Sequence, residues 1–108
     1  MTTQISKLIK ESTKMANDHG WSVVWNKTST SSTVLSVGDK IALIHSELSE
    51  ALEAYRDDDK YEFGVEIADT FIRLFHLCGD LDIDIEKFIE EKMEKNRTRP
   101  PKHGRKNY

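Results

Sequence analysis

Two pairs of acidic residues in the middle of the chain have the spacing that places both members on one side of a helix. Glu47 and Glu50 are three residues apart, and Glu66 and Asp69 have the same separation. Residues at this spacing share a helical face, where like charges repel each other mildly. One such pair is typical of a solvated surface, so the residues around each pair decide whether it can do chemistry.

The second pair lies in a segment that is otherwise almost wholly apolar. Between residues 63 and 78, apolar side chains cover more than half of the helical circumference, which predicts a largely buried helix. Glu66 and Asp69 share the narrow remaining strip with Arg73 and His76. Burying unpaired carboxylates is costly, so this strip needs cations. Arg73 follows Asp69 by four residues and can form an ion pair with it along the helix.

The cation that suits four converging carboxylates is a hard divalent ion. Glu47 borders the apolar stripe of its own segment, so it also differs from an ordinary solvent-facing charge. One arginine cannot neutralise four carboxylates, whereas Mg²⁺ prefers oxygen ligands and leaves positions open for phosphate oxygens. Neither acidic pair has a histidine or cysteine at ligand spacing, which argues against zinc. No histidine follows a glutamate by three residues, which argues against a di-iron site. We therefore expect a Mg²⁺ site.

Three polar residues near the end of the chain are candidates for binding phosphate. Lys92 and Asn96 continue the apolar stripe of the last expected helix, and Arg99 continues it if the helical turn persists. Taken by itself, the position of Lys92 on the apolar stripe is explained if its aliphatic stem covers apolar surface while its ammonium group reaches water. Beside a carboxylate cluster a second interpretation gains weight. In it, Lys92 and Arg99 hold phosphates and Asn96 orients a phosphate oxygen or a water.

Two tryptophans, Trp21 and Trp25, stand in a short apolar patch after the first expected helix. One interpretation is that they cap the end of a helical bundle. The other is that one of them stacks on an aromatic ligand. Both remain open from the sequence.

The elements that must position these residues are helices. Periodicity, caps and breakers predict an all-α chain resembling a four-helix bundle, with a possible strand only at Ser22–Trp25. Gly20 and Gly79 are expected to stop the first and third helices, and Ser36 with Asp39 resembles a capping box. The helices are expected over about residues 4–19, 36–56, 60–78 and 82 or 84 to 96 or 98, with a Ser- and Thr-rich mobile connection at Asn26–Ser36.

The length of 108 residues predicts a single domain. It divides into an N-terminal helix and mobile loop (1–36), the motif-bearing helices (37–99) and a basic tail (100–108). A core this small is often completed by oligomerisation through helices. The tail is either a solubilising extension or a segment that closes over a ligand on a neighbouring subunit.

Charge and composition exclude several classes of protein. A formal net charge of -3 favours neither nucleic-acid nor membrane binding, and no apolar run is long enough to cross a bilayer. The chain has one cysteine, Cys78, and begins without a basic and apolar leader. We expect a cytoplasmic protein.

The pattern Glu47-x-x-Glu50, followed after fifteen residues by Glu66-x-x-Asp69, resembles the signature of the MazG-like all-α nucleoside triphosphate pyrophosphohydrolases. The later run of Lys92, Asn96 and Arg99 resembles the phosphate-binding pattern of that family, and the resemblance extends over about residues 37–103. It implies a helical homodimer or homotetramer with active sites near subunit interfaces. It also implies Mg²⁺-dependent hydrolysis of an NTP or dNTP to the monophosphate and pyrophosphate, in house-cleaning of the nucleotide pool. By position, the metal ligands and catalytic residues would be Glu47, Glu50, Glu66 and Asp69.

Two other functions remain compatible with the sequence. One is a non-enzymatic helical module that dimerises through its apolar faces. The other is a phosphohydrolase that uses the same metal site on another pyrophosphate-containing substrate. Residues 1–36 match no motif and are where base selection is expected, so the preferred base stays open.

Overall fold

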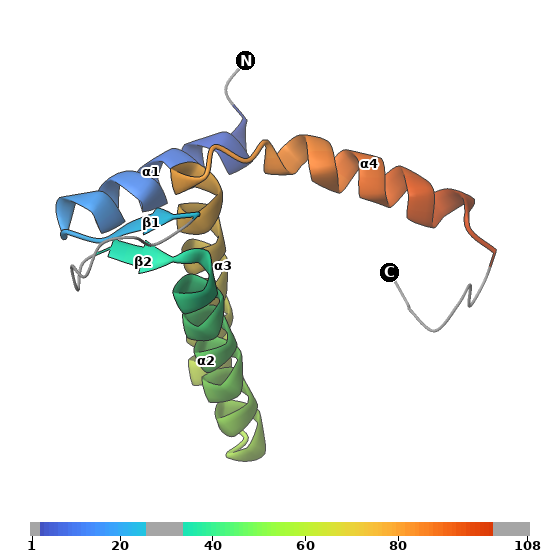
Figure 1. Cartoon of the computed structure of the whole chain (residues 1–108). Coiled ribbons are helices and arrows are strands. Elements are labelled where there is room, and N and C mark those ends of the chain that lie inside the picture. Colours follow the sequence, from blue (N-terminus) through green and yellow to red (C-terminus); the bar gives the residue numbers. More distant parts are fainter. Residues whose placement is uncertain (1–2, 26–33, 101–108) are drawn as a thin grey trace.

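The structure, a computed structural model, describes residues 3–25 and 34–100 (Figure 1). These residues are mostly helical, which confirms the all-α prediction at the level of fold class. The elements in chain order are α1 (Gln4–Asp18), β1 (Ser22–Val24), β2 (Val34–Ser36), α2 (Val37–Arg56), α3 (Lys60–Asp80) and α4 (Ile85–Thr98). None of the helices in the described ranges is long and apolar enough to cross a membrane.

Helices α2 and α3 form an antiparallel hairpin, and α1 packs against α3 near the other end of that hairpin (Figure 1). The predicted capping box begins α2, with Ser36 and Asp39 each accepting from the other's backbone N–H. The tight turn into α3 uses Asp58 in the left-handed region at φ 54°. Asp59 then caps α3 by accepting from the backbone N–H of Glu62. Local capping therefore fixes both helix starts at the hairpin.

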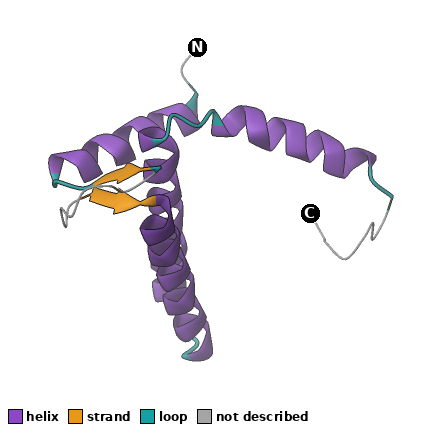
Figure 2. Cartoon of the chain, viewed as in Figure 1, coloured by secondary structure: helices purple, strands orange, loops and turns teal. Residues whose placement is uncertain are grey.

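The two strands form a small parallel pair beside the helices (Figure 2). Ser22 pairs with Val34 and Val24 with Ser36, so β1 confirms the strand suggested at Ser22–Trp25. The mobile connection predicted at Asn26–Ser36 is wrong for its last three residues, which form β2. A three-residue strand is too short to show alternation, and its pairing is decided by a distant partner. Residues 26–33 lie outside the described part of the chain.

Gly79 does not stop α3, which continues to Asp80. A Cβ added at Gly79 would lie 1.8 Å from Oγ1 of Thr13 on α1, so this glycine allows the close approach of two helices. The chain turns after the helix at Asp82, which has a φ of 54°. The predicted stop was therefore a packing position.

The apolar faces of α2 and α3 are exposed in the single chain. The small core combines Val23, Ile44 and Leu77 with partly buried neighbours from the strands and helix ends. On α3 the polar strip is the buried side, with Glu66 and His76 inside, so the prediction of a largely buried helix is wrong for one chain. The exposed large apolar side chains are Ile41, Leu48, Leu52 and Tyr55 on α2 and Tyr61, Phe63, Phe71, Ile72 and Leu74 on α3.

Helix α4 extends away from the other helices (Figure 1). A short contact between the side chains of Thr3 and Glu86 joins its first turn to the start of α1. No residue of α4 is buried, and Phe88 and Met93 are exposed. Within the described residues of one chain, α1, α2 and α3 pack together and the predicted four-helix bundle is not completed. Residues 101–108 of the basic tail lie outside the described part.

Candidate functional site

Three of the four predicted carboxylates converge between α2 and α3. One ligand oxygen from each of Glu47, Glu66 and Asp69 lies within 4.8 Å of the others. Glu47 and Glu66 are buried, and Asp69 is half-buried. The helix hairpin thus brings together groups from two separate motifs, and we call these three residues the acidic cluster.

Glu50 stands at the edge of the acidic cluster. It is exposed and is not among the three residues whose oxygens converge. It nevertheless raises the pKa of Glu66 to about 8, chiefly because proton sharing between the two carboxyl groups favours the protonated form. Burial acts next in the same direction, followed by the neighbouring Glu62 and Glu47. Glu50 is therefore close to the cluster but more open to solvent than its members.

The ion pair of Arg73 differs from the predicted one. Its Nε and Nη2 atoms each lie 2.9 Å from Oε1 of Glu47 on α2, whereas Asp69 was the expected partner. Arg73 reaches across the hairpin, so its guanidinium lies beside a more deeply buried carboxylate, where a compensating positive charge stabilises the fold more. This pair leaves the carboxyl groups of Glu66 and Asp69 without an ion-pair partner among the described residues.

The acidic cluster has the donor set that a hard divalent cation requires. Its three ligands are carboxylates, which favours Mg²⁺ over a softer metal. Oε2 of Glu66 is buried and has no hydrogen-bond partner in the described structure. A buried acceptor without a donor is rare, and a bound cation would satisfy it. Glu47, Glu66 and Asp69 therefore fit the predicted metal.

A cavity of about 600 Å³ adjoins the acidic cluster, and its lining combines residues of α1, β2, α2 and α3 with the turn after α1. Asp69 belongs to both the cluster and the cavity wall, and Arg73 lines the cavity beside it. Trp21, 44% exposed, also lines the cavity. Trp25 is 71% exposed and is not part of the described lining. Of the two tryptophans, only Trp21 is therefore placed to meet a ligand there.

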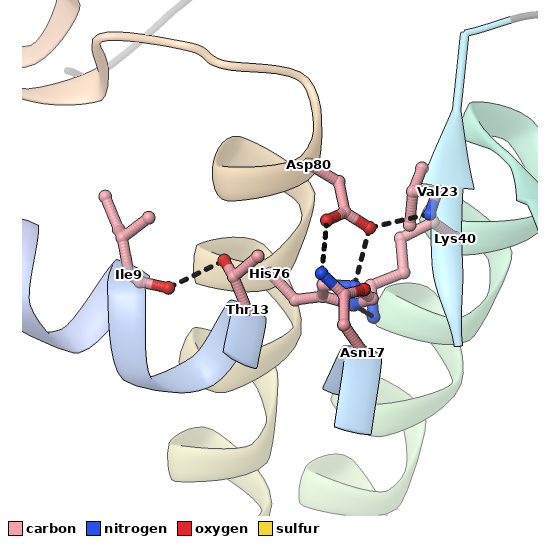
Figure 3. A network of polar contacts seen from close by, with 7 residues as sticks. All are labelled: Ile9, Thr13, Asn17, Val23, Lys40, His76 and Asp80. Carbon is pink, nitrogen blue, oxygen red and sulfur yellow. Dashed lines mark hydrogen bonds and ion pairs between the residues drawn. The ribbon is translucent and has the colours of Figure 1, made fainter. Parts of the chain in front are cut away.

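A buried polar network behind this cavity was not predicted from the sequence (Figure 3). Lys40 Nζ donates to Nδ1 of His76 at 2.9 Å. On the other side of the ring, Nε2 of His76 lies 2.8 Å from Oδ2 of Asp80, at an angle outside hydrogen-bond geometry. Asp80 also accepts from the backbone N–H of Val23 at 2.7 Å and from the side chain of Asn17 at 3.3 Å. The network joins α1, β1, α2 and α3.

Burial sets the ionisation of the two inner groups of this network. Burial, followed by the charge of the nearby Arg73, lowers the pKa of Lys40, and Asp80 opposes the shift, so that the pKa is about 8. Burial, then the charge of Lys40, lowers the pKa of His76. At neutral pH the lysine is charged and the imidazole is neutral. A sequence signal could have placed Lys40 at the site, because Lys40 precedes Glu47 by seven residues and therefore lies on the same face of the helix.

The predicted phosphate-binding residues are not brought to the acidic cluster within one chain. Lys92 is exposed on α4, which points away from α2 (Figure 1). Asn96 is half-buried, and its Oδ1 has no partner in the described structure. Helix α4 ends at Thr98, and Arg99 is extended with ψ 145° because the residue before a proline avoids helical geometry. The predicted inward stripe of α4 therefore faces solvent in the single chain.

Comparisons with models of protein families, with curated proteins and with solved structures find no significant match to this chain. The geometry of the site itself is therefore what indicates a function. That geometry is a carboxylate cluster suited to a divalent cation, sharing Asp69 with a cavity of about 600 Å³.

Proposed function

We propose that this chain is a MazG-like, Mg²⁺-dependent pyrophosphohydrolase that converts an NTP or dNTP and water to the monophosphate and pyrophosphate. The observation that carries the proposal is the position of Asp69, which belongs both to the acidic cluster and to the wall of the adjoining cavity. A triphosphate needs cations, and a nucleoside needs a partly apolar cavity of several hundred Å³. The two lie side by side here. We further propose that the enzyme acts in the cytoplasm in house-cleaning of the nucleotide pool.

The roles of the residues follow from their surroundings. Glu47, Glu66 and Asp69 would hold Mg²⁺, which when bound would polarise the phosphate oxygens as a Lewis acid. Glu50 is exposed beside the cluster and would take the proton of the attacking water. Arg73 lines the cavity and would place positive charge beside the phosphates. Trp21 would stack on the base.

The proposal includes a second copy of the chain. Apolar side chains exposed on α2, α3 and α4 form faces that monomeric proteins seldom leave open to water. Covering them with a second chain would complete the helical bundle as a homodimer or as a homotetramer. A neighbour's α4 would then supply Lys92, Asn96 and Arg99 to the triphosphate, which α4 of the same chain does not approach (Figure 1).

One observation favours the rival function of a non-enzymatic dimerisation module. The ion pair of Arg73 with Glu47 gives one carboxylate of the cluster a purely structural partner. Such a module would need the exposed apolar faces but no cation and no cavity. A catalytic experiment separates the two functions.

The test is a panel of NTPs and dNTPs incubated with Mg²⁺ and scored for pyrophosphate and for orthophosphate. We expect pyrophosphate from the wild type and loss of most turnover in Asp69→Asn and Glu50→Gln, with helical content retained. Glu53→Gln is the matched control, because Glu53 is exposed on α2 and, among the described residues, forms an ion pair only with Arg56 at the surface. Near-wild-type release by Asp69→Asn would refute the assignment. Release of orthophosphate would indicate that another bond of the triphosphate is cleaved. Absence of any product would favour the dimerisation module.

A further inference from the structure

The cavity beside the acidic cluster has an unusual inner wall. Lys40 begins this wall in the first turn of α2 and is only 4% exposed. His76 on α3 is 2% exposed and lies in contact with it. Both residues line the cavity, so their buried polar groups border the space that a ligand would fill.

While it is charged, the amine of Lys40 donates hydrogen bonds and cannot accept them. An ammonium group carries three hydrogens and no lone pair. One hydrogen is directed to Nδ1 of His76 at 2.9 Å, and no other hydrogen bond to the amine is found among the described residues (Figure 3). Two N–H groups therefore remain for a ligand in the cavity.

His76 holds the amine of Lys40 in place by accepting one of its hydrogens. Its Nε2 faces the carboxylate of Asp80 at 2.8 Å, so the ring proton belongs on that nitrogen. Asp80 is itself held by the backbone of Val23 and the side chain of Asn17 (Figure 3). Nδ1 is left as an acceptor for Lys40. The network thus anchors one hydrogen of the lysine and fixes the position of the others.

The remaining walls suit a flat aromatic ring with acceptors on its edge. Trp21, Leu43 and Ile72 supply aromatic and apolar surface. Asp69 is the only carboxylate among the described lining residues, and it belongs to the acidic cluster. A ring that enters the cavity therefore meets a donor at Lys40.

We propose that Lys40, held by His76, makes this cavity selective for nucleobases with a carbonyl group at purine position 6 or pyrimidine position 4. The inference rests on the proposed function, because a triphosphate at the acidic cluster would direct the base into the cavity. Guanine, hypoxanthine, uracil and thymine present a carbonyl acceptor at that position, whereas adenine and cytosine present an amino donor. An amino group at that position has no acceptor for Lys40, so it leaves the two remaining N–H groups of the ammonium buried and unpaired. Loss of a hydrogen bond to a charged group then costs on the order of tenfold to a hundredfold in kcat/KM.

Wild-type selectivity is the primary test, because it needs no variant. ITP and ATP share their sugar, triphosphate and N7 acceptor and differ at position 6 and at the N1 proton, while UTP and CTP provide the pyrimidine pair. We expect kcat/KM with Mg²⁺ to favour ITP and UTP by about tenfold or more, in the ribose or the deoxyribose series. Equal kcat/KM values within each pair, or a preference for ATP and CTP, would overturn the inference while leaving the pyrophosphohydrolase intact.

Substitution then tests whether Lys40 is the source of the selectivity. Lys40→Met keeps the length of the stem and removes the donors, so the ITP to ATP ratio should fall to about twofold or less. Lys40→Gln offers both a donor and an acceptor and should also narrow the ratio, which covers the case in which one variant does not fold. Lys60→Met is the matched control, because Lys60 is exposed at the start of α3. A ratio that survives both Lys40 variants, with circular dichroism unchanged, would refute the role of Lys40.

A binding measurement separates this inference from the proposed hydrolysis. Calorimetry with the α,β-imido analogues of ITP and ATP reports selectivity without turnover. Tighter binding of the ITP analogue by about tenfold supports the inference even if no nucleotide is cleaved. Equal binding overturns it, and absence of binding by both analogues overturns it together with the proposed function.

Discussion

Arg73 on α3 directs both Nε and Nη2 to a single oxygen of Glu47 on α2, each at 2.9 Å. This ion pair joins the two helices at the acidic cluster. It neutralises one of the three converging carboxylates and leaves Glu66 and Asp69 without an ion pair in the described part of the chain. The cluster consequently keeps a negative charge that a divalent cation can balance.

We expect Mg²⁺ to stabilise the protein, and to stabilise Arg73→Gln more than the wild type. Removing the guanidinium leaves Glu47 buried without a partner, which costs about 1 to 3 kcal/mol in EDTA. A cation at the cluster would restore part of that loss. At a hundredfold excess over its Kd, Mg²⁺ adds about 2.7 kcal/mol through binding alone. Thermal unfolding with EDTA or with Mg²⁺ measures both effects.

Arg56→Gln is the control for this experiment, because the ion pair of Arg56 within the described ranges is with Glu53 at the surface, away from the acidic cluster. It should show the same Mg²⁺ response as the wild type. If Mg²⁺ leaves the unfolding temperature of every variant unchanged, the acidic cluster does not hold the ion.

A charge on the exposed apolar face of α3 should break the proposed oligomer. Phe71 is 54% exposed in the single chain, and a second chain would bury it. Phe71→Glu would bury an unpaired carboxylate in that interface. We expect light scattering to show a smaller mass, while Lys60→Glu, a charge change elsewhere on the helix, keeps that of the wild type. A monomeric wild type would contradict the expectation.

Gly79→Ala should destabilise the contact between α1 and α3. The new methyl group would lie 1.8 Å from Oγ1 of Thr13, so the helices must separate, at a cost of about 1 to 3 kcal/mol. Chemical denaturation measures the change. Gly64→Ala, on the same helix with nothing within 4 Å, should instead stabilise by about 0.5 to 1 kcal/mol. The double variant with Thr13→Ala should recover part of the loss, and strict additivity would refute the clash.

The selectivity for carbonyl bases should weaken as the pH rises through about 8. Burial and Arg73 lower the pKa of Lys40 to about 8, and Asp80 and the neutral His76 are the other groups that face it. Above that pH the amine is neutral and can accept as well as donate, so an amino base is no longer rejected. We expect the ITP to ATP ratio to fall between pH 6.5 and 8.5.

Lys40→Met supplies the baseline for this pH series. Ionisation of the nucleotides themselves changes the ITP to ATP ratio of Lys40→Met and the ITP to ATP ratio of the wild type in the same way. A wild-type ratio whose pH profile parallels that of Lys40→Met would show that the lysine is not the titrating group.

Local signals in the sequence predicted most of the secondary structure. Ser36 and Asp39 form the expected capping box, and α2 ends at Arg56 as predicted. Pro100 ends α4 within the expected limits. Such features depend on neighbouring residues, so they are visible without the fold. Gly79 could not be interpreted in this way, because the need for a glycine there comes from Thr13 on another helix.

The acidic motifs were also readable in the sequence, since residues three apart share a helical face wherever the helix lies. Only the tertiary structure decided which partners they meet. It placed Arg73 beside Glu47, and it set Lys40 against His76. It also turned the polar strip of α3 inward and the side bearing Phe71 outward in the single chain. Periodicity defines the faces of a helix, but which face is buried depends on the helices that pack against it.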